Sequence, residues 1–148
     1  MNEQPKPLCT VGYERETLDG LIGRLRAAGV AVVIDVRAVA ASRRPGFSKT
    51  MLGNGLRAEG IDYVHLRPLG TPKAGREAAR AGRIEEMREI FHAHLVEPAA
   101  VTALEEAAQI ARDRPAALLC YEAEARCCHR AIVAEEIRQR LHCEVLDL

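Results

Sequence analysis

The sequence predicts an α/β fold, in which helices cover both faces of a mostly parallel sheet of about five strands. This is a three-layer arrangement of the Rossmann-like or flavodoxin-like kind. Short apolar runs alternate with amphipathic helical patterns along the whole chain. The length of 148 residues suits one domain, and neither a linker nor an internal repeat interrupts it. We therefore expect a single domain over residues 1–148, with residues 1–7 flexible.

The first half of the chain predicts three strands and two helices. Residues 8–13 are apolar enough for a first strand, and Thr17 is placed to cap the helix that follows. The nearly continuous apolar run Val30–Val36 is typical of a central parallel strand that is covered on both faces. After a basic loop, Ser48 is placed to cap a second helix, and Ile61–Leu66 is expected to be the third strand.

The second half predicts three helical segments and two strands. A long helical region is broken near Gly82, and Pro98 occupies the first position of the next helix. A strand at 116–121 and a helix at about 128–141 follow, and residues 143–148 close the sheet.

In a parallel sheet, the loops that follow the strands all leave from one edge, and ligands bind there. We call this edge the rim. The chain places most of its reactive polar residues at strand ends, so they are expected to share the rim: Tyr13, Asp35, Arg37, His65, Arg67, Cys120 and Glu122.

Composition limits the classes of function. The 21 basic residues balance the 21 acidic ones, so global charge gives no reason to expect non-specific nucleic-acid binding. The N-terminus lacks an apolar signal core, and no apolar run reaches the ~18 residues of a membrane span. We expect a cytoplasmic protein whose five cysteines, an odd number, are free, metal-binding or reactive rather than a disulfide framework.

The densest group of reactive side chains lies within residues 118–130, where a strand passes into the last helix. Cys128 is expected in the first turn of that helix, beside His129 and Arg130, where the helix dipole and positive charge favour a thiolate. Such a thiolate is a nucleophile or a metal ligand, whereas the alternative is a small, inert packing residue. Cys120 is a weaker candidate that could belong to the core.

Two further groups lie near the rim. Asp35 ends an apolar strand and needs a hydrogen-bond donor, so we expect it to cap a neighbouring loop or to pair with an arginine such as Arg130. If the strand continues, we expect Asp35 and Arg37 to point to opposite faces, so a pair between them is not assured. Arg37 and the basic loop Ser42–Lys49, which includes Arg43, form either an anion clamp or a solvated surface. Three of the five aromatic residues could stack on a base or cover the sheet edge: Tyr13, Phe47 and Tyr121.

Two motif interpretations involve the cysteines. Cys120 and Arg126 have the spacing of a thiol phosphatase loop, but Glu122 and Glu124 within it would repel a phosphate, and we reject this interpretation. A zinc or iron site is the more serious alternative. Its consecutive ligands would be difficult to place around one ion, and the usual Cys-x2-Cys spacing is absent. The candidate ligands are Cys120, Glu122, Cys127, Cys128 and His129.

Several segments together resemble the family known as domain of unknown function 488 (DUF488). They are Thr10–Tyr13, Ile34–Arg37, Ser42–Arg43 with Phe47, Tyr63–Leu66 with Leu69–Gly70, and Cys120-x-Glu122-x5-Cys128-His-Arg130. The resemblance implies a compact α/β domain with one polar pocket. The residues that it implies for this pocket are Tyr13, Asp35, Arg37, Ser42, Arg43, Cys120, Glu122, Cys128, His129 and Arg130.

The leading hypothesis is an enzyme that acts on a phosphate-bearing or nucleotide-like substrate. Cys128, or the His129/Glu122 pair, would supply the nucleophile or the general acid and base, with Asp35 as a further catalytic candidate. We assign substrate binding to Tyr13, Arg37, Ser42, Arg43, Phe47, Cys120 and Arg130. The alternatives are a nucleotide or nucleic-acid binding module without turnover, and a metal or redox-thiol protein. The sequence names no cofactor and assigns no residue to a metal.

Overall fold

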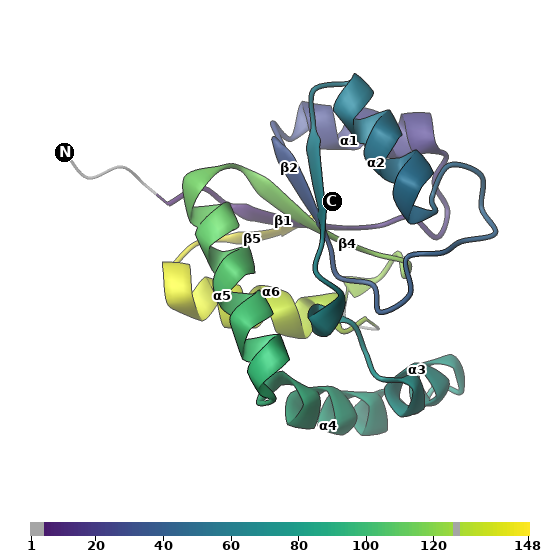
Figure 1. Ribbon diagram of the computed structural model, residues 1–148, viewed down its shortest axis with the longest axis vertical. Helices are drawn as coiled ribbons and strands as arrows, with labels where there is room; N and C mark the ends of the chain where they lie inside the picture. The colour runs from purple at the N-terminus through teal and green to yellow at the C-terminus, as the bar shows by residue number, and fades with distance from the viewer. Residues whose placement is uncertain (1–4, 126–127) are drawn as a thin grey trace.

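The computed structural model describes residues 5–125 and 128–148 and confirms the α/β fold (Figure 1). In this part of the chain, five strands form one all-parallel sheet in the order β3-β2-β4-β1-β5. The strands are β1 (Leu8–Gly12), β2 (Val32–Asp35), β3 (Asp62–His65), β4 (Ala116–Cys120) and β5 (Val145–Asp147). Each lies within the apolar run that predicted it. The predicted flexibility of residues 1–4 falls outside the described residues, and residues 5–7 are exposed.

The described residues also form six α-helices and one 3-10 turn, η1 (Arg67–Leu69). The helices are α1 (Leu18–Ala27), α2 (Lys49–Ala58), α3 (Lys73–Arg80), α4 (Ile84–Leu95), α5 (Pro98–Asp113) and α6 (Arg130–Leu141). The predicted break near Gly82 separates α3 from α4, because Gly82 adopts a left-handed φ of 79° that ends the first of them. No helix among the described residues is both long and apolar enough to cross a membrane.

Two helix caps were expected, and one of them forms. The Thr17 hydroxyl accepts a hydrogen bond from the Gly20 amide at 3.0 Å and so caps α1. Ser48 also precedes its helix, but its hydroxyl makes no capping bond. It bonds instead to the backbone amide and carbonyl of Ser42, at 3.0 and 3.1 Å. The Ser48 side chain thus holds the basic loop in place rather than the helix.

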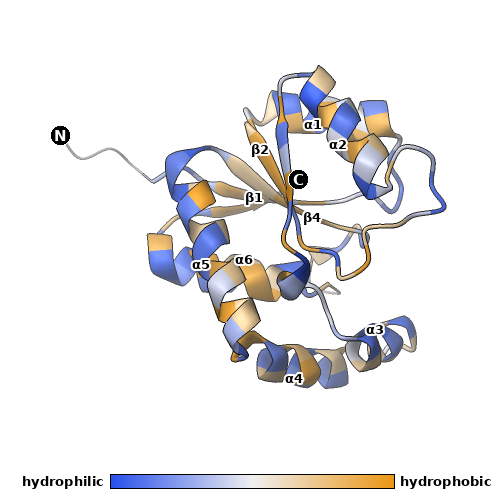
Figure 2. Ribbon diagram, in the orientation of Figure 1, coloured by the Kyte–Doolittle hydropathy of each residue, from blue (hydrophilic) through white to orange (hydrophobic). Residues whose placement is uncertain are grey.

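Successive side chains of each strand point to opposite faces of the sheet, so the interior consists of two apolar layers. Val33 and Leu119 face the layer that contains α1 and α2, whereas Ile34 and Leu118 face the layer that contains α4, α5 and α6. Figure 2 shows the orange sheet between helices whose outer sides are largely blue. Since β1, β2 and β4 are buried along their whole length, they carry the continuous apolar sequences that the prediction relied on.

The strand order creates a switch point between β1 and β4. The chain leaves β1 through α1 to reach β2 on one side, and it leaves β4 through α6 to reach β5 on the other. The two connections lie on opposite faces of the sheet, so the loops after β1 and β4 diverge. Open α/β sheets bind ligands in the crevice that such a divergence leaves.

Candidate functional site

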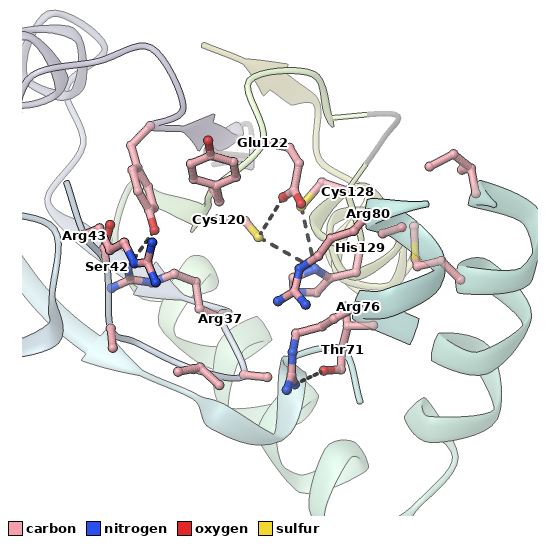
Figure 3. A pocket seen from close by; sticks show the side chains of 18 of the residues that line it. Arg37, Ser42, Arg43, Thr71, Arg76, Arg80, Cys120, Glu122, Cys128 and His129 are labelled. Carbon is pink, nitrogen blue, oxygen red and sulfur yellow. Dashed lines mark hydrogen bonds between the residues drawn. The ribbon is translucent and has the colours of Figure 1, made fainter. Parts of the chain in front are cut away.

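A pocket of about 790 Å³ opens at the carboxyl ends of β1, β2 and β4, where the switch point predicts a crevice (Figure 3). Its remaining wall comes from the segment that leads into α3 and from α3 and α4 themselves. Eight of the eleven site residues chosen from the sequence line it. These are Tyr13, Arg37, Ser42, Arg43, Cys120, Glu122, Cys128 and His129.

The other three chosen residues lie outside the pocket lining. Phe47 is buried and stacks on Tyr13, with ring centroids 4.5 Å apart. Arg130 is fully buried, and its guanidinium donates hydrogen bonds to the backbone carbonyls of Glu122 and Ala123. Asp35 is also fully buried, behind Arg37. All three support the residues that reach the cavity.

The partner of Asp35 is Arg37, and not the Arg130 that we suggested. The Arg37 guanidinium donates to both Asp35 carboxylate oxygens, with an Nη2–Oδ2 distance of 2.7 Å and an Nε–Oδ1 distance of 2.9 Å. The Tyr63 hydroxyl donates to Oδ2 at 2.5 Å. Residues two apart in an extended segment point to the same side, which is why this pair forms.

Arg37 uses its remaining donors to fix the rim. Its Nη1 donates to the Tyr13 hydroxyl at 3.0 Å and to the Phe47 carbonyl at 2.7 Å. Burial alone would lower the pKa of Arg37, but the hydrogen bonds and charge of Asp35 raise it above its ordinary value. The guanidinium therefore stays charged, and Asp35 neutralises it. Arg37 joins three rim segments and adds little net charge to the pocket.

Two thiols and an imidazole meet at the floor of the pocket. His129 Nδ1 lies 3.6 Å from Cys128 Sγ and 3.7 Å from Cys120 Sγ, and all three atoms lie within 4.8 Å of one another. His129 Nε2 lies 2.7 Å from the Val36 carbonyl oxygen. Because a carbonyl only accepts, Nε2 carries a proton, and Nδ1 faces both sulfurs. Burial would lower the pKa of His129, but the charge of the Cys128 thiolate and its hydrogen bond with the ring raise it.

The helix α6 begins at Arg130, so Cys128 lies just before the helix rather than in its first turn. The Cys128 amide donates a hydrogen bond to the Ala125 carbonyl at 2.9 Å. His129 already has helical dihedral angles (φ −60°, ψ −19°). Its side chain therefore turns back beside Cys128, and the expected difficulty of bringing consecutive donors together does not arise. The candidates Arg126 and Cys127 lie outside the described residues.

Burial and mutual contact shift the pKa values of this group. Burial would raise the pKa of Cys128, but hydrogen bonds from Cys120 and His129 and the imidazolium charge bring it well below its usual value. The hydrogen bond with Cys128, together with burial, raises the pKa of Cys120. Burial and the neighbouring Cys128 thiolate raise the pKa of Glu122 to about 7. The cluster thus favours one thiolate and leaves Glu122 able to exchange a proton near neutral pH.

The arginines that face the cavity differ from those chosen in advance. Arg43 and Arg80 are exposed, and neither has a hydrogen-bond or ion-pair partner in the described part of the chain. Arg76 Nη1 donates to the Thr71 carbonyl at 2.9 Å. Figure 3 shows Arg80 and Arg76 extending from α3 towards the cysteine–histidine cluster, and Arg43 farther away, next to Ser42. The free positive charge of the pocket comes from these three residues.

Arg76 and Arg80 were missed because they belong to α3, and no strand-end argument reaches this helix. Their spacing of four residues places them on one face of a helix, which the sequence could have shown. Which way that face turns depends on packing. Gly75 lies close to Ile90 of α4, where an added Cβ would meet the Ile90 side chain at 3.3 Å. Gly75 thus lies against α4, while Arg76 and Arg80 of the same helix line the cavity.

The three rim aromatics do not share one role. Tyr13 and Phe47 cover each other, and Tyr121 meets the edge of Tyr13 with ring centroids 5.4 Å apart. Tyr121 keeps 45% of its surface exposed and lines the pocket. It is the member of this group that a ligand could stack on.

The comparisons with known proteins agree with this geometry. The sequence profile described as "Domain of unknown function DUF488" matches residues 17–137, which is most of the chain. The chain belongs to the DUF488 family. The resemblance drawn from the motifs is confirmed, and the matched range includes every pocket-lining residue except Tyr13. No curated protein and no solved structure matches the chain. The DUF488 assignment therefore identifies relatives, and the site itself must indicate the chemistry.

Proposed function

We propose that this protein is an enzyme that acts on a phosphate-bearing or nucleotide-like substrate in the pocket at the switch point. Arg43, Arg76 and Arg80 bind the anionic group, and the reaction takes place at Cys128, His129 and Glu122. One observation carries the proposal: guanidiniums without a carboxylate partner among the described residues line the same 790 Å³ cavity as a cluster of reactive groups. In this proposal Asp35 positions Arg37 and does not touch the substrate.

The case for an anionic substrate comes from charge. Arg43, Arg76 and Arg80 face one cavity, and Glu122 is the one carboxylate among the described residues that line it. Guanidiniums that line one cavity without a counter-ion raise its positive potential, and a bound anion neutralises that charge. Planar guanidiniums also match the oxygens of a phosphate with paired hydrogen bonds. Tyr121 adds an exposed ring for a base or sugar.

The case for turnover comes from the floor of the pocket. Glu122 Oε2 lies 3.4 Å from Cys120 Sγ, which in turn lies 3.7 Å from His129 Nδ1. Proton acceptors, thiols and an imidazole thus lie in one contact network. The bond from His129 to Val36 fixes the orientation of the ring. A module that only binds an anion needs the arginines but has no use for this group.

Removing either free guanidinium should weaken anion binding. We expect Arg43→Ala and Arg80→Ala each to raise the dissociation constant about 10-fold or more, because a charged hydrogen bond is lost in each case. Nucleoside phosphates, sugar phosphates and inorganic phosphate would be screened by thermal shift, and the best compound would be titrated by calorimetry. Arg140→Ala, at the far end of α6, is the matched control. Equal affinities in all three variants would contradict the proposed anion site.

A measurement of product formation distinguishes an enzyme from a binding module. We expect Glu122→Gln to lower kcat at least about 100-fold with little change in KM, because it removes a proton acceptor and leaves the arginines in place. Product formation from the compounds that bind would be followed by mass spectrometry. Glu105→Gln, on exposed α5 surface, is the control. Tight binding without any product in the wild-type protein would favour the alternative, a nucleotide-binding module.

A further inference from the structure

Two features of the cysteine–histidine cluster go beyond what a nucleophilic cysteine needs. The first is the number of donors. A nucleophilic cysteine needs one thiol and one base, yet two thiols face the same nitrogen at similar distances, 3.6 and 3.7 Å. The second is the position of the cluster. All three donor residues are buried, at 3–6% exposure, but they line an open pocket.

The distances fit one particular arrangement. Zinc holds thiolate sulfur at about 2.3 Å and imidazole nitrogen at about 2.1 Å in a tetrahedron, which separates a sulfur and a nitrogen ligand by about 3.6 Å. The separations of Nδ1 from the two sulfurs, 3.6 and 3.7 Å, agree with this value. The same bond length separates two sulfur ligands by about 3.8 Å. The three donor atoms lie within 4.8 Å of one another, so small side-chain adjustments would bring all of them onto one ion.

The surroundings of His129 support the same arrangement. A histidine that ligates a metal donates its other ring N–H to a carbonyl or carboxylate, and this bond sets the tautomer. His129 Nε2 donates to the Val36 carbonyl at 2.7 Å, and Nδ1, the atom that would present its lone pair to a metal, faces the two sulfurs. Val36 directly follows β2, so a buried strand end holds the ring in place.

We propose that Cys120, Cys128 and His129 bind one Zn²⁺ ion in a tetrahedral site whose fourth position faces the pocket. Two thiolates and an imidazole are donors that zinc prefers, and three protein ligands with one open position are typical of a catalytic site. This inference rests on the proposed function and adds the group that the pocket would use. A water on the fourth position would lie next to Glu122. Zinc would make such a water more acidic, and the Glu122 carboxylate would accept the proton when the O–H bond breaks.

Metal content of the wild-type protein tests the site directly. The chain would be purified without an affinity tag and its metals measured by elemental analysis, and we expect about one zinc per chain. Exchange with Co²⁺ should give the intense visible bands of a tetrahedral site and a thiolate-to-cobalt charge-transfer band. A zinc content near zero, together with no binding of added Zn²⁺ or Co²⁺ in equilibrium dialysis, would overturn the inference.

Substitution identifies the ligands. Cys120→Ser, Cys128→Ser and His129→Gln should each weaken Zn²⁺ binding about 100-fold or more, since even supporting partners of ligands contribute 10- to 100-fold. Cys143→Ser makes the same chemical change at a buried thiol outside the cluster and should bind Zn²⁺ as the wild type does. Unchanged binding in the three ligand variants would overturn the assignment.

A measurement on the wild type covers the case in which a ligand variant fails to fold. Iodoacetamide labelling, mapped by mass spectrometry, should modify Cys120 and Cys128 only after Zn²⁺ is chelated. Equal labelling with and without the chelator would overturn the site. The anion titrations with Arg43→Ala and Arg80→Ala do not depend on the metal. A metal-free protein that still binds and converts a phosphate compound would therefore refute the zinc site and leave the proposed function standing.

Discussion

Replacing Arg37 by alanine is expected to lower the free energy of unfolding by about 3–5 kcal/mol. Asp35 is fully buried, and Arg37 is 4% exposed. Truncation would leave a buried carboxylate with the Tyr63 hydroxyl and one backbone amide as donors, after loss of the guanidinium that contacts both of its oxygens. Urea denaturation followed by circular dichroism measures the difference.

The control for this prediction is an ion pair of the same type at the surface. Arg26 and Glu59 are joined at 2.8 Å, but their side chains are 61% and 45% exposed. Arg26→Ala should therefore change stability by less than about 1 kcal/mol. If the two variants were destabilised equally, Arg37 would not hold the rim together, and its pairing with Asp35 would be energetically unimportant.

Hydrophobic pattern was enough to predict the layers. The run Val30–Val36 is apolar because β2 has core on both sides, and the same is true of the residues that form β4. Because the strands were expected to be parallel, their carboxyl ends were expected to lie at one edge of the sheet. This one inference brought Tyr13, Cys120 and Glu122 into the same pocket without any knowledge of strand order. The order itself could not be predicted, because it depends on how α1 and α6 pack.

The positions of charged residues in the sequence predicted the site less well than the apolar pattern predicted the layers. The sequence does not distinguish an arginine that binds backbone carbonyls from one that faces the pocket. Arg130 follows two reactive residues and was expected to hold an anion, yet the backbone carbonyls of Glu122 and Ala123 occupy its guanidinium. Arg76 and Arg80 lie far from any strand end along the chain, and they reach the pocket through the packing of α3 against α4. The expectation that Asp35 and Arg37 point to opposite faces was wrong, because side chains two residues apart in an extended segment point to the same side.

Gly12→Ala is expected to destabilise the protein by about 3 kcal/mol or more and to distort the site. Gly12 ends β1 beside Cys120, its partner in register on β4. An alanine Cβ there would overlap the carbonyl oxygen of Glu122 and lie 2.9 Å from Arg130 Nη1. Overpacking costs about 1–3 kcal/mol when side chains can yield. Here the obstacle is backbone that Arg130 holds in place, so we expect a larger cost.

The same change should also disturb the pocket, because the backbone that must move carries the Glu122 side chain. Urea denaturation measures the stability, and Zn²⁺ content and anion affinity report on the site. Gly23→Ala is the control: it lies on exposed α1 with nothing within 4 Å of an added Cβ. Alanine is the better helix former by about 1 kcal/mol, so this variant should gain stability. If Gly12→Ala kept full stability, zinc and affinity, the close approach of β1 to the Glu122 loop would have no part in shaping the site.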